Sequence, residues 1–188
     1  MFEQLISRIA AELRRAGIPY MIIGGQAVLL HGVPRMTKDI DITLGVDTQD
    51  LDKVVKSIAA IGLEIIPDHF ESFVERTFVL PARHQESGIR VDFIFSFIPY
   101  ERQAIDRAKQ VLLAGEPVMF ASAEDVIIHK CFAGRPRDLE DARSIIIKNP
   151  DLDQAYVRGW LKELEILPER EGLSQAFEDL LAPARQDS

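Results

Sequence analysis

Apolar residues near the start of the chain recur at the spacing of a helix. They fall on one helical face: Phe2, Leu5, Ile6, Ile9, Ala10 and Leu13. This helix is expected to end at Gly17, because glycine favours a helix end and Pro19 cannot continue one. A second amphipathic helix is predicted to begin at an N-cap on Asp47 and to run to about Ala60.

Short apolar runs around these helices predict strands. One run covers residues 20–23 and is followed by a tight turn at Gly24 and Gly25 and a short helix, and the next strand begins at Asp39. Further strand-like runs cover residues 63–66, 73–80 and 89–95, with a hairpin formed by 110–113 and 118–120. Because a meander of strands follows a helix, the sheet should be mixed rather than all parallel.

After residue 121 the pattern becomes helical. Ser122 begins this part in an arrangement that resembles a capping box with Asp125. Further helices are expected over residues 138–147, 152–164 and 170–181, and the tail, residues 183–188, is expected to be disordered. The pattern predicts an α+β fold with a core in residues 1–121 and a C-terminal helical region in residues 122–188.

Two carboxylates stand on the strand that begins at Asp39. Since side chains alternate across a strand, Asp39 and Asp41 share one face, while Ile40 and Ile42 point to the core. Paired carboxylates repel each other unless a cation lies between them. Mg²⁺ is the natural candidate, because it takes hard oxygen ligands and commonly shares its site with substrate phosphates.

Gly24-Gly25, followed at a distance by Asp39-Ile40-Asp41, resembles the signature of the nucleotidyltransferase superfamily. More narrowly, the stretch GGQAVLLHGVPRMTKDIDI is similar to AbiEii-type nucleotidyltransferases, the toxin half of some toxin–antitoxin systems. The resemblance covers roughly residues 15 to 145. It implies a nucleotidyltransferase-type sheet and a third acid on a later strand, for which Asp92 is the candidate; the alternative for Asp92 is a solvent-facing residue on an edge strand.

The same resemblance implies a set of nucleotide contacts. Arg35 and Thr37 match an Arg-x-Thr-x-Asp-x-Asp pattern of the resembled proteins, and the two glycines would let a triphosphate approach the backbone. Three alternatives stay open: the glycines serve only a positive φ, Arg35 pairs with Asp39, and Lys130 forms a salt bridge to Asp138 instead of reaching the phosphates.

Composition limits the class of protein. The chain has 188 residues, 47% of them hydrophobic and 28% charged, as in ordinary globular proteins. We expect a cytoplasmic protein without a membrane segment, because the N-terminus has no signal-peptide pattern, no apolar run is long enough to span a bilayer, and the single cysteine, Cys131, excludes an intramolecular disulfide. The net charge of −8 leaves nucleic acid possible but unsupported.

These observations predict a metal-dependent enzyme that moves an NMP from an NTP to an acceptor hydroxyl. Asp39, Asp41 and Asp92 would be the catalytic and metal-binding residues, with Mg²⁺, or Mn²⁺ in its place, as the cofactor. Gly24, Gly25, Arg35, Thr37 and Lys130 would bind the nucleotide. The resemblance implies tRNA as the acceptor and an antitoxin as partner, whereas other transferases of this kind use a small molecule or a protein. A second hypothesis is a catalytically inactive sensor or binding partner with the same fold.

Overall fold

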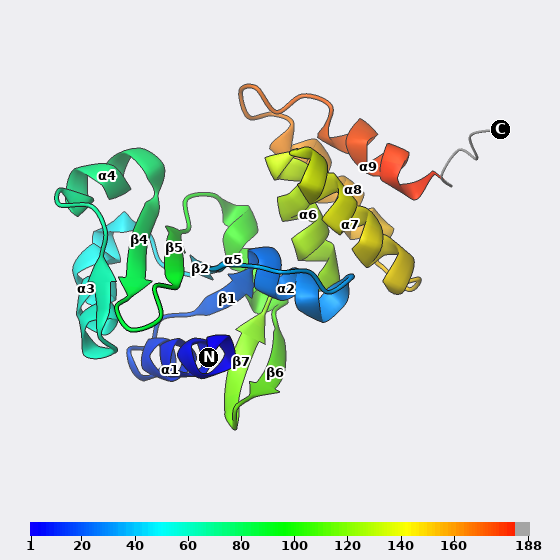
Figure 1. The fold of residues 1–188 in the computed structure, drawn as a ribbon. Coiled ribbons are helices and arrows are strands. Elements are labelled where there is room, and N and C mark those ends of the chain that lie inside the picture. The colour runs from blue at the N-terminus through cyan, green and yellow to red at the C-terminus, as the bar shows by residue number, and fades with distance from the viewer. Residues whose placement is uncertain (183–188) are drawn as a thin grey trace. The chain divides into compact units, whose positions relative to one another are not determined.

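Seven strands pair into one sheet in the order β3-β4-β5-β2-β1-β7-β6 (Figure 1). A computed structural model describes residues 1–182 of the chain. The strands are β1 (Tyr20–Ile23), β2 (Asp39–Leu44), β3 (Leu63–Ile65), β4 (Val79–His84), β5 (Arg90–Phe95), β6 (Lys109–Leu113) and β7 (Glu116–Phe120). Strand β2 runs parallel to β5 and β1 runs parallel to β7, whereas the other neighbours are antiparallel. The predicted mixed sheet is confirmed.

The chain divides into two compact units. Unit 1 comprises Met1–Gln26 and Met36–Ala121 and contains the whole sheet, and unit 2 comprises Ala27–Arg35 and the described residues from 122 onward. The helices of unit 1 are α1 (Phe2–Arg15), the 3-10 helix η1 (Thr48–Asp50), α3 (Leu51–Ala60), α4 (Phe70–Thr77) and α5 (Pro99–Asp106). Helix α2 (Gly24–His31) begins in unit 1 and ends in unit 2. Helix α1 packs against β7, β6 and α3.

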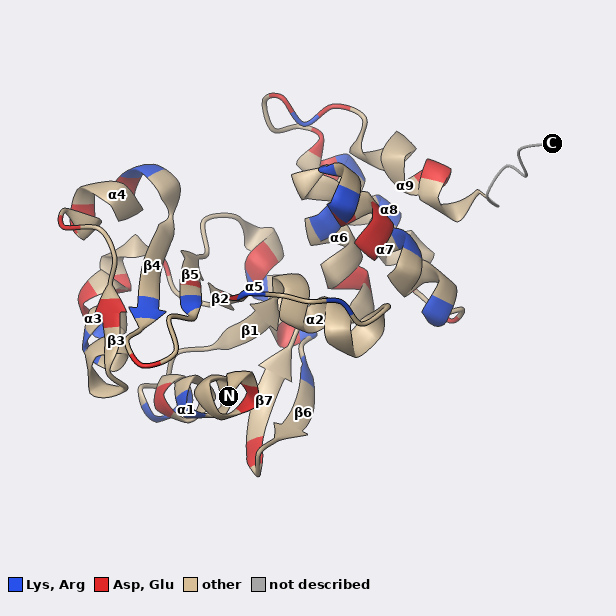
Figure 2. Ribbon diagram, in the orientation of Figure 1, with Lys and Arg blue, Asp and Glu red and all other residues tan. Residues whose placement is uncertain are grey.

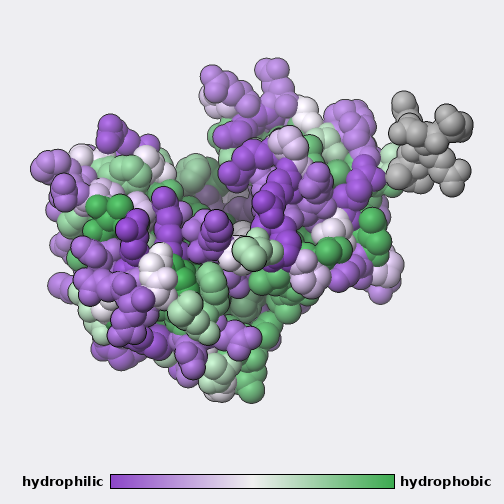
Figure 3. Space-filling view, in the orientation of Figure 1, coloured by the Kyte–Doolittle hydropathy of each residue, from purple (hydrophilic) through white to green (hydrophobic). Residues whose placement is uncertain are grey.

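The apolar faces of the central strands form the core of unit 1. Ile40 and Ile42 of β2 are fully buried, and so is Val91 of β5, whereas Asp41 and Asp92 on the opposite face are only partly buried. This is the alternation expected of strands that cover a core on one side only. Figure 3 shows that the visible face of this unit carries mostly hydrophilic residues over β4 and β5.

The interpretation of residues 73–80 as one strand is wrong. Helix α4 occupies Phe70–Thr77 and the strand β4 begins only at Val79. Val74 is the buried residue of α4, and Phe70 lies four positions before it on the same helical face. Phe78 ends the helix in the left-handed conformation with φ +57. A short apolar run is too brief to show whether its period is that of a helix or of a strand. Packing in the folded protein therefore determines which of the two forms.

The predicted separate turn after the first strand is also wrong, because helix α2 starts directly at Gly24, whose φ is +61. No helix within residues 1–182 is long and apolar enough to cross a membrane. The expected disorder of residues 183–188 concerns residues outside the described part of the chain.

Unit 2 consists of the end of α2 and a group of packed helices. They are α6 (Ala123–Ala133), α7 (Pro136–Lys148), α8 (Gln154–Leu164) and α9 (Leu173–Leu181). Ser122 caps α6, because its hydroxyl accepts a hydrogen bond from the Asp125 amide, and Gly134 ends it in the left-handed conformation. Helix α6 packs against the three helices that follow it.

Candidate active site

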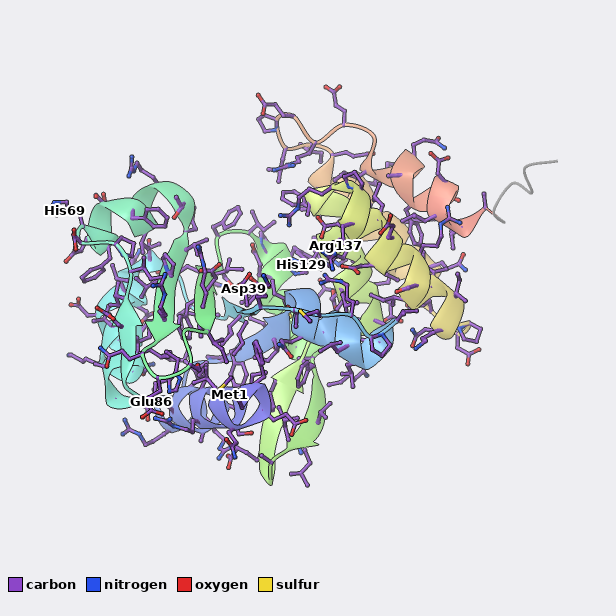
Figure 4. All side chains as sticks on the ribbon, in the orientation of Figure 1. Met1, Asp39, His69, Glu86, His129 and Arg137 are labelled. Atoms are coloured by element: carbon purple, nitrogen blue, oxygen red, sulfur yellow. The ribbon has the colours of Figure 1, made fainter. Side chains whose placement is uncertain are left out.

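Three aspartates lie on the polar face of two neighbouring strands in unit 1. Asp39 and Asp41 are on β2 and Asp92 is on β5, and the parallel register places Asp41 directly opposite Asp92 (Figure 4, where Asp39 is labelled). Neighbouring strands are about 4.8 Å apart, so the two carboxylates of such a pair lie close enough for their charges to interact. The register therefore places Asp92 beside Asp41, and the sequence had assigned these two acids to different strands.

Arg90 supplies a cation beside this group. It lies opposite Asp39 in the register, and its Nε donates to both oxygens of Asp92 at 2.9 and 3.1 Å. The hydrogen bond to Asp92, and more weakly the charges of Asp39 and Asp41, raise the pKa of Arg90. Sequence analysis did not single out Arg90, although its position two residues before Asp92 places it on the same strand face.

The glycines at the start of α2 allow the backbone to approach these residues closely. A Cβ on Gly24 would lie 1.9 Å from Oδ2 of Asp41, and one on Gly25 would lie 2.3 Å from Oγ1 of Thr37. No side chain fits at either place without displacing its neighbour. The positive φ of Gly24 is thus one of two reasons for glycine there, and close approach to the acidic strand is the other.

The residue types on this face suit a divalent cation. Carboxylate oxygens are the ligands that Mg²⁺ and Mn²⁺ accept, and closely spaced acids gain from a cation between them. Within residues 1–182, however, no three acids, histidines or cysteines are grouped closely enough to hold a metal ion. Both oxygens of Asp92 accept hydrogen bonds from Arg90.

Arg35 and Lys130 belong to unit 2, where both form ion pairs with Asp141 of α7. Arg35 donates through Nε and Nη2 to the two carboxylate oxygens of Asp141, each at 2.7 Å. Lys130 Nζ lies 2.7 Å from Asp138 and 3.0 Å from Asp141. The salt bridge from Lys130 to Asp138, which was one of the open alternatives, is therefore present. Asp141 was missed, because its spacing from Arg35 along the chain carries no local signal.

Charge pairing, and not exposure to water, keeps these carboxylates ionised. Burial raises the pKa of Asp141, but hydrogen bonds from Arg35 and Lys130 outweigh it and leave that pKa below the ordinary value of 3.8. For Asp138, burial also raises the pKa and the hydrogen bonds from Lys130 and Arg135 lower it. The net result is again a pKa below the ordinary value. This network therefore holds two basic side chains in fixed positions in unit 2.

Asp141→Asn is expected to destabilise the protein by about 3 kcal/mol, because it leaves the buried Lys130 and the bidentate Arg35 without a full counter-charge. The matched control is Glu178→Gln, which breaks an exposed ion pair with Arg158 in the same unit and should cost less than about 1 kcal/mol. Urea denaturation followed by circular dichroism measures both. Equal costs for the two variants would contradict the structural role of Asp141.

The lowered pKa of Asp141 also predicts how the destabilisation by Asp141→Asn depends on pH. Because the folded pKa of Asp141 is lowered, its stabilisation is complete above the ordinary pKa of 3.8 and is lost as the pH falls through the folded pKa. The difference in unfolding free energy between wild type and Asp141→Asn should therefore be constant at pH 5 to 7, on the order of the value above, and should shrink below about pH 4.

One family model matches most of the chain. The family described as "Nucleotidyltransferase of unknown function (DUF6036)" matches residues 2–163. A search of curated proteins found no match.

Solved structures share the fold at low sequence identity. The crystal structure of ANT(2'')-Ia in complex with adenylyl-2''-tobramycin is 20% identical, with 96% of this chain and 98% of that chain covered and a TM-score of 0.58. An antigenic nucleotidyltransferase-like protein from Paracoccidioides brasiliensis is 19% identical, with 94% and 91% covered and a TM-score of 0.58. The solution structure of the antibiotic-resistance factor ANT(2'')-Ia gives a TM-score of 0.57 at 18% identity, with 94% and 91% covered.

Proposed function

The chain belongs to the nucleotidyltransferase family described above, and from this premise we propose that it moves an NMP from an NTP to an acceptor hydroxyl with Mg²⁺ bound by Asp39, Asp41 and Asp92. The observation that carries the proposal is the register of β2 and β5, which places Asp41 opposite Asp92 on the polar face of the sheet. Metal-assisted transfer of this kind needs carboxylates that lie close enough together to hold the metal ions.

Each acid has a proposed task. Asp39 and Asp41 would hold the metal, whose charge, when it is bound, neutralises the phosphate oxygens and activates the attacking group. Asp92 would share the metal and accept the proton of the acceptor hydroxyl. For Asp92 to act in this way, its hydrogen bonds from Arg90 have to be exchanged.

The nucleotide contacts are proposed in the same way. Gly24 and Gly25 form the start of α2, where a helix N-terminus favours phosphate, and Thr37 lies against Gly25. Arg35 and Lys130 stay proposed phosphate contacts on the strength of the sequence motif.

Mg²⁺ is the proposed cofactor, with Mn²⁺ as the substitute. Titration with Mn²⁺, followed by electron paramagnetic resonance, measures this without any acceptor. We expect the wild-type protein to bind Mn²⁺ more tightly when an NTP is present, and Asp39→Asn to lose that gain. A protein that serves only as an inactive sensor without metal would show no metal-dependent NTP binding.

The acceptor is tested with NTPs labelled at the α-phosphate, incubated with the protein, Mg²⁺ and a bacterial extract. Label that nuclease removes supports an RNA acceptor and the AbiEii-like role of a toxin with an antitoxin partner. Label that protease removes indicates a protein acceptor, and label only in small molecules indicates an acceptor like the antibiotic named with ANT(2'')-Ia. NTP binding with no transfer to any of these would overturn the proposal in favour of an inactive sensor.

A further inference from the structure

Asp92 takes its neutralising charge from its own strand. Its neighbours in the register are Pro81 of β4 and Asp41 of β2. Pro81 has neither an amide hydrogen nor a polar side chain, and Asp41 carries the same charge as Asp92. Arg90 lies two residues before Asp92 on the same strand face, and its Nε donates to both oxygens of that carboxylate. Neither of the two cross-strand neighbours can neutralise Asp92, whereas Arg90 does so.

The two partners of this ion pair differ in their exposure to water. The side chain of Arg90 is 48% exposed, but that of Asp92 is only 19% exposed. Ion pairs with an exposed partner are weak, so the guanidinium can turn into water at little cost. A mostly buried carboxylate beside another acid, in contrast, needs a cation to stay ionised. Arg90 can therefore leave Asp92 only when another cation replaces it.

Arg90 stands among all the proposed metal ligands. It is bonded to Asp92 and lies opposite Asp39 in the register of β5 and β2. Figure 2 shows the basic segment that begins β5. A guanidinium and a metal ion need the same oxygens of Asp92, and two cations close to each other repel. Binding of Arg90 to Asp92 and binding of a metal ion to Asp92 therefore exclude each other.

We propose that Arg90 is a positioning residue for Asp92, which holds this carboxylate in the metal-free protein and moves into water when the divalent cation binds. The inference rests on the proposed function, because it takes the metal ligands from it. Its consequence is a competition between Arg90 and the metal. The apparent affinity for the metal is lowered by the fraction of molecules in which Asp92 is still occupied by Arg90.

The first test measures binding of Mn²⁺ alone by electron paramagnetic resonance. We expect Arg90→Gln to bind Mn²⁺ about fivefold more tightly than wild type, the range of an exposed ion pair that no longer has to be broken. Loss of any positive charge near the acids would also strengthen binding. The matched control is therefore Arg83→Gln, because Arg83 is exposed and lies opposite Arg90, and not opposite Asp92. It should change the affinity by less than about twofold.

The second test follows the displacement in the wild-type protein, so it does not depend on the folding of a variant. Nitrogen-15 NMR resolves the Nε–H signals of arginine side chains, and Mg²⁺ is added as a diamagnetic metal. We expect the Nε–H signal of Arg90 to move to the position of a water-exposed arginine. The internal reference is Arg158, whose Nε donates to Glu178 in unit 2 and whose signal should not change.

The outcomes separate this inference from the proposed function. Equal Mn²⁺ affinity of wild type and Arg90→Gln, or an Arg90 signal that Mg²⁺ leaves unchanged, would overturn the inference, while Mg²⁺-dependent NMP transfer would leave the proposed function standing. Equal gains in Arg83→Gln and Arg90→Gln would also overturn it, because charge alone would then explain them. No Mn²⁺ binding by wild type or either variant, even with an NTP, would overturn both. Displacement of Arg90 without NMP transfer to any acceptor would support the role of Arg90 and overturn the proposed function.

Discussion

Asp41→Asn is expected to reduce NMP transfer by at least about 10³-fold, because phosphoryl transfer depends on positioned charge and Asp41 lies at the centre of the acidic face. The fold should survive the change. Asp41 faces Asp92 across the strands, and removing one of several neighbouring negative charges relieves repulsion. Transfer of labelled NMP from an α-labelled NTP, together with thermal unfolding, measures both effects.

The matched control for this variant is Asp68→Asn. Asp68 is an exposed residue between β3 and α4, so the substitution removes the same charge away from the acidic face. It should leave the transfer rate within about twofold of wild type, since surface substitutions of this kind have small effects. A transfer rate of Asp41→Asn close to that of Asp68→Asn would contradict the assignment of the acids.

Gly24→Ala is expected to reduce transfer about 10²-fold and to lower stability. The added Cβ would stand 1.9 Å from Oδ2 of Asp41, so either the start of α2 or the carboxylate has to move. A misplacement of about 1 Å in a positioned catalytic group is enough for such a loss of rate. Kinetics of NMP transfer and chemical denaturation measure the two effects.

Gly88→Ala separates the clash from the backbone strain. Gly88 has φ +70, close to the φ +61 of Gly24, but a Cβ there would meet nothing within 4 Å. Both variants carry the left-handed conformational cost of about 1 kcal/mol, and only Gly24→Ala displaces Asp41. Equal activity of the two variants would show that contact between Gly24 and Asp41 has no part in catalysis.

Local patterns in the sequence were sufficient to predict those features whose physical cause lies between residues close in sequence. Alternation along β2 and β5 placed Asp39, Asp41 and Asp92 on polar faces, because the direction of a side chain in a strand depends only on its position in that strand. Helix caps such as Ser122 were found for the same reason, since the hydroxyl and the amide that it binds are close in sequence. The error over residues 73–80 arose where an apolar run was too short to show its period.

Tertiary structure alone decided which distant residues meet. The pairing of Asp41 with Asp92, the position of Arg83 opposite Arg90, and the hold of Asp141 on Arg35 depend on strand register and helix packing. Arg35 and Asp141 are 106 positions apart, and no local preference specifies such a pair. The sequence by itself determined which strand faces carry Asp39, Asp41 and Asp92, and it placed most elements to within a few residues. Their partners followed only when burial of the apolar faces had set the order and register of the strands, because burial is a property of the whole core and not of any one segment.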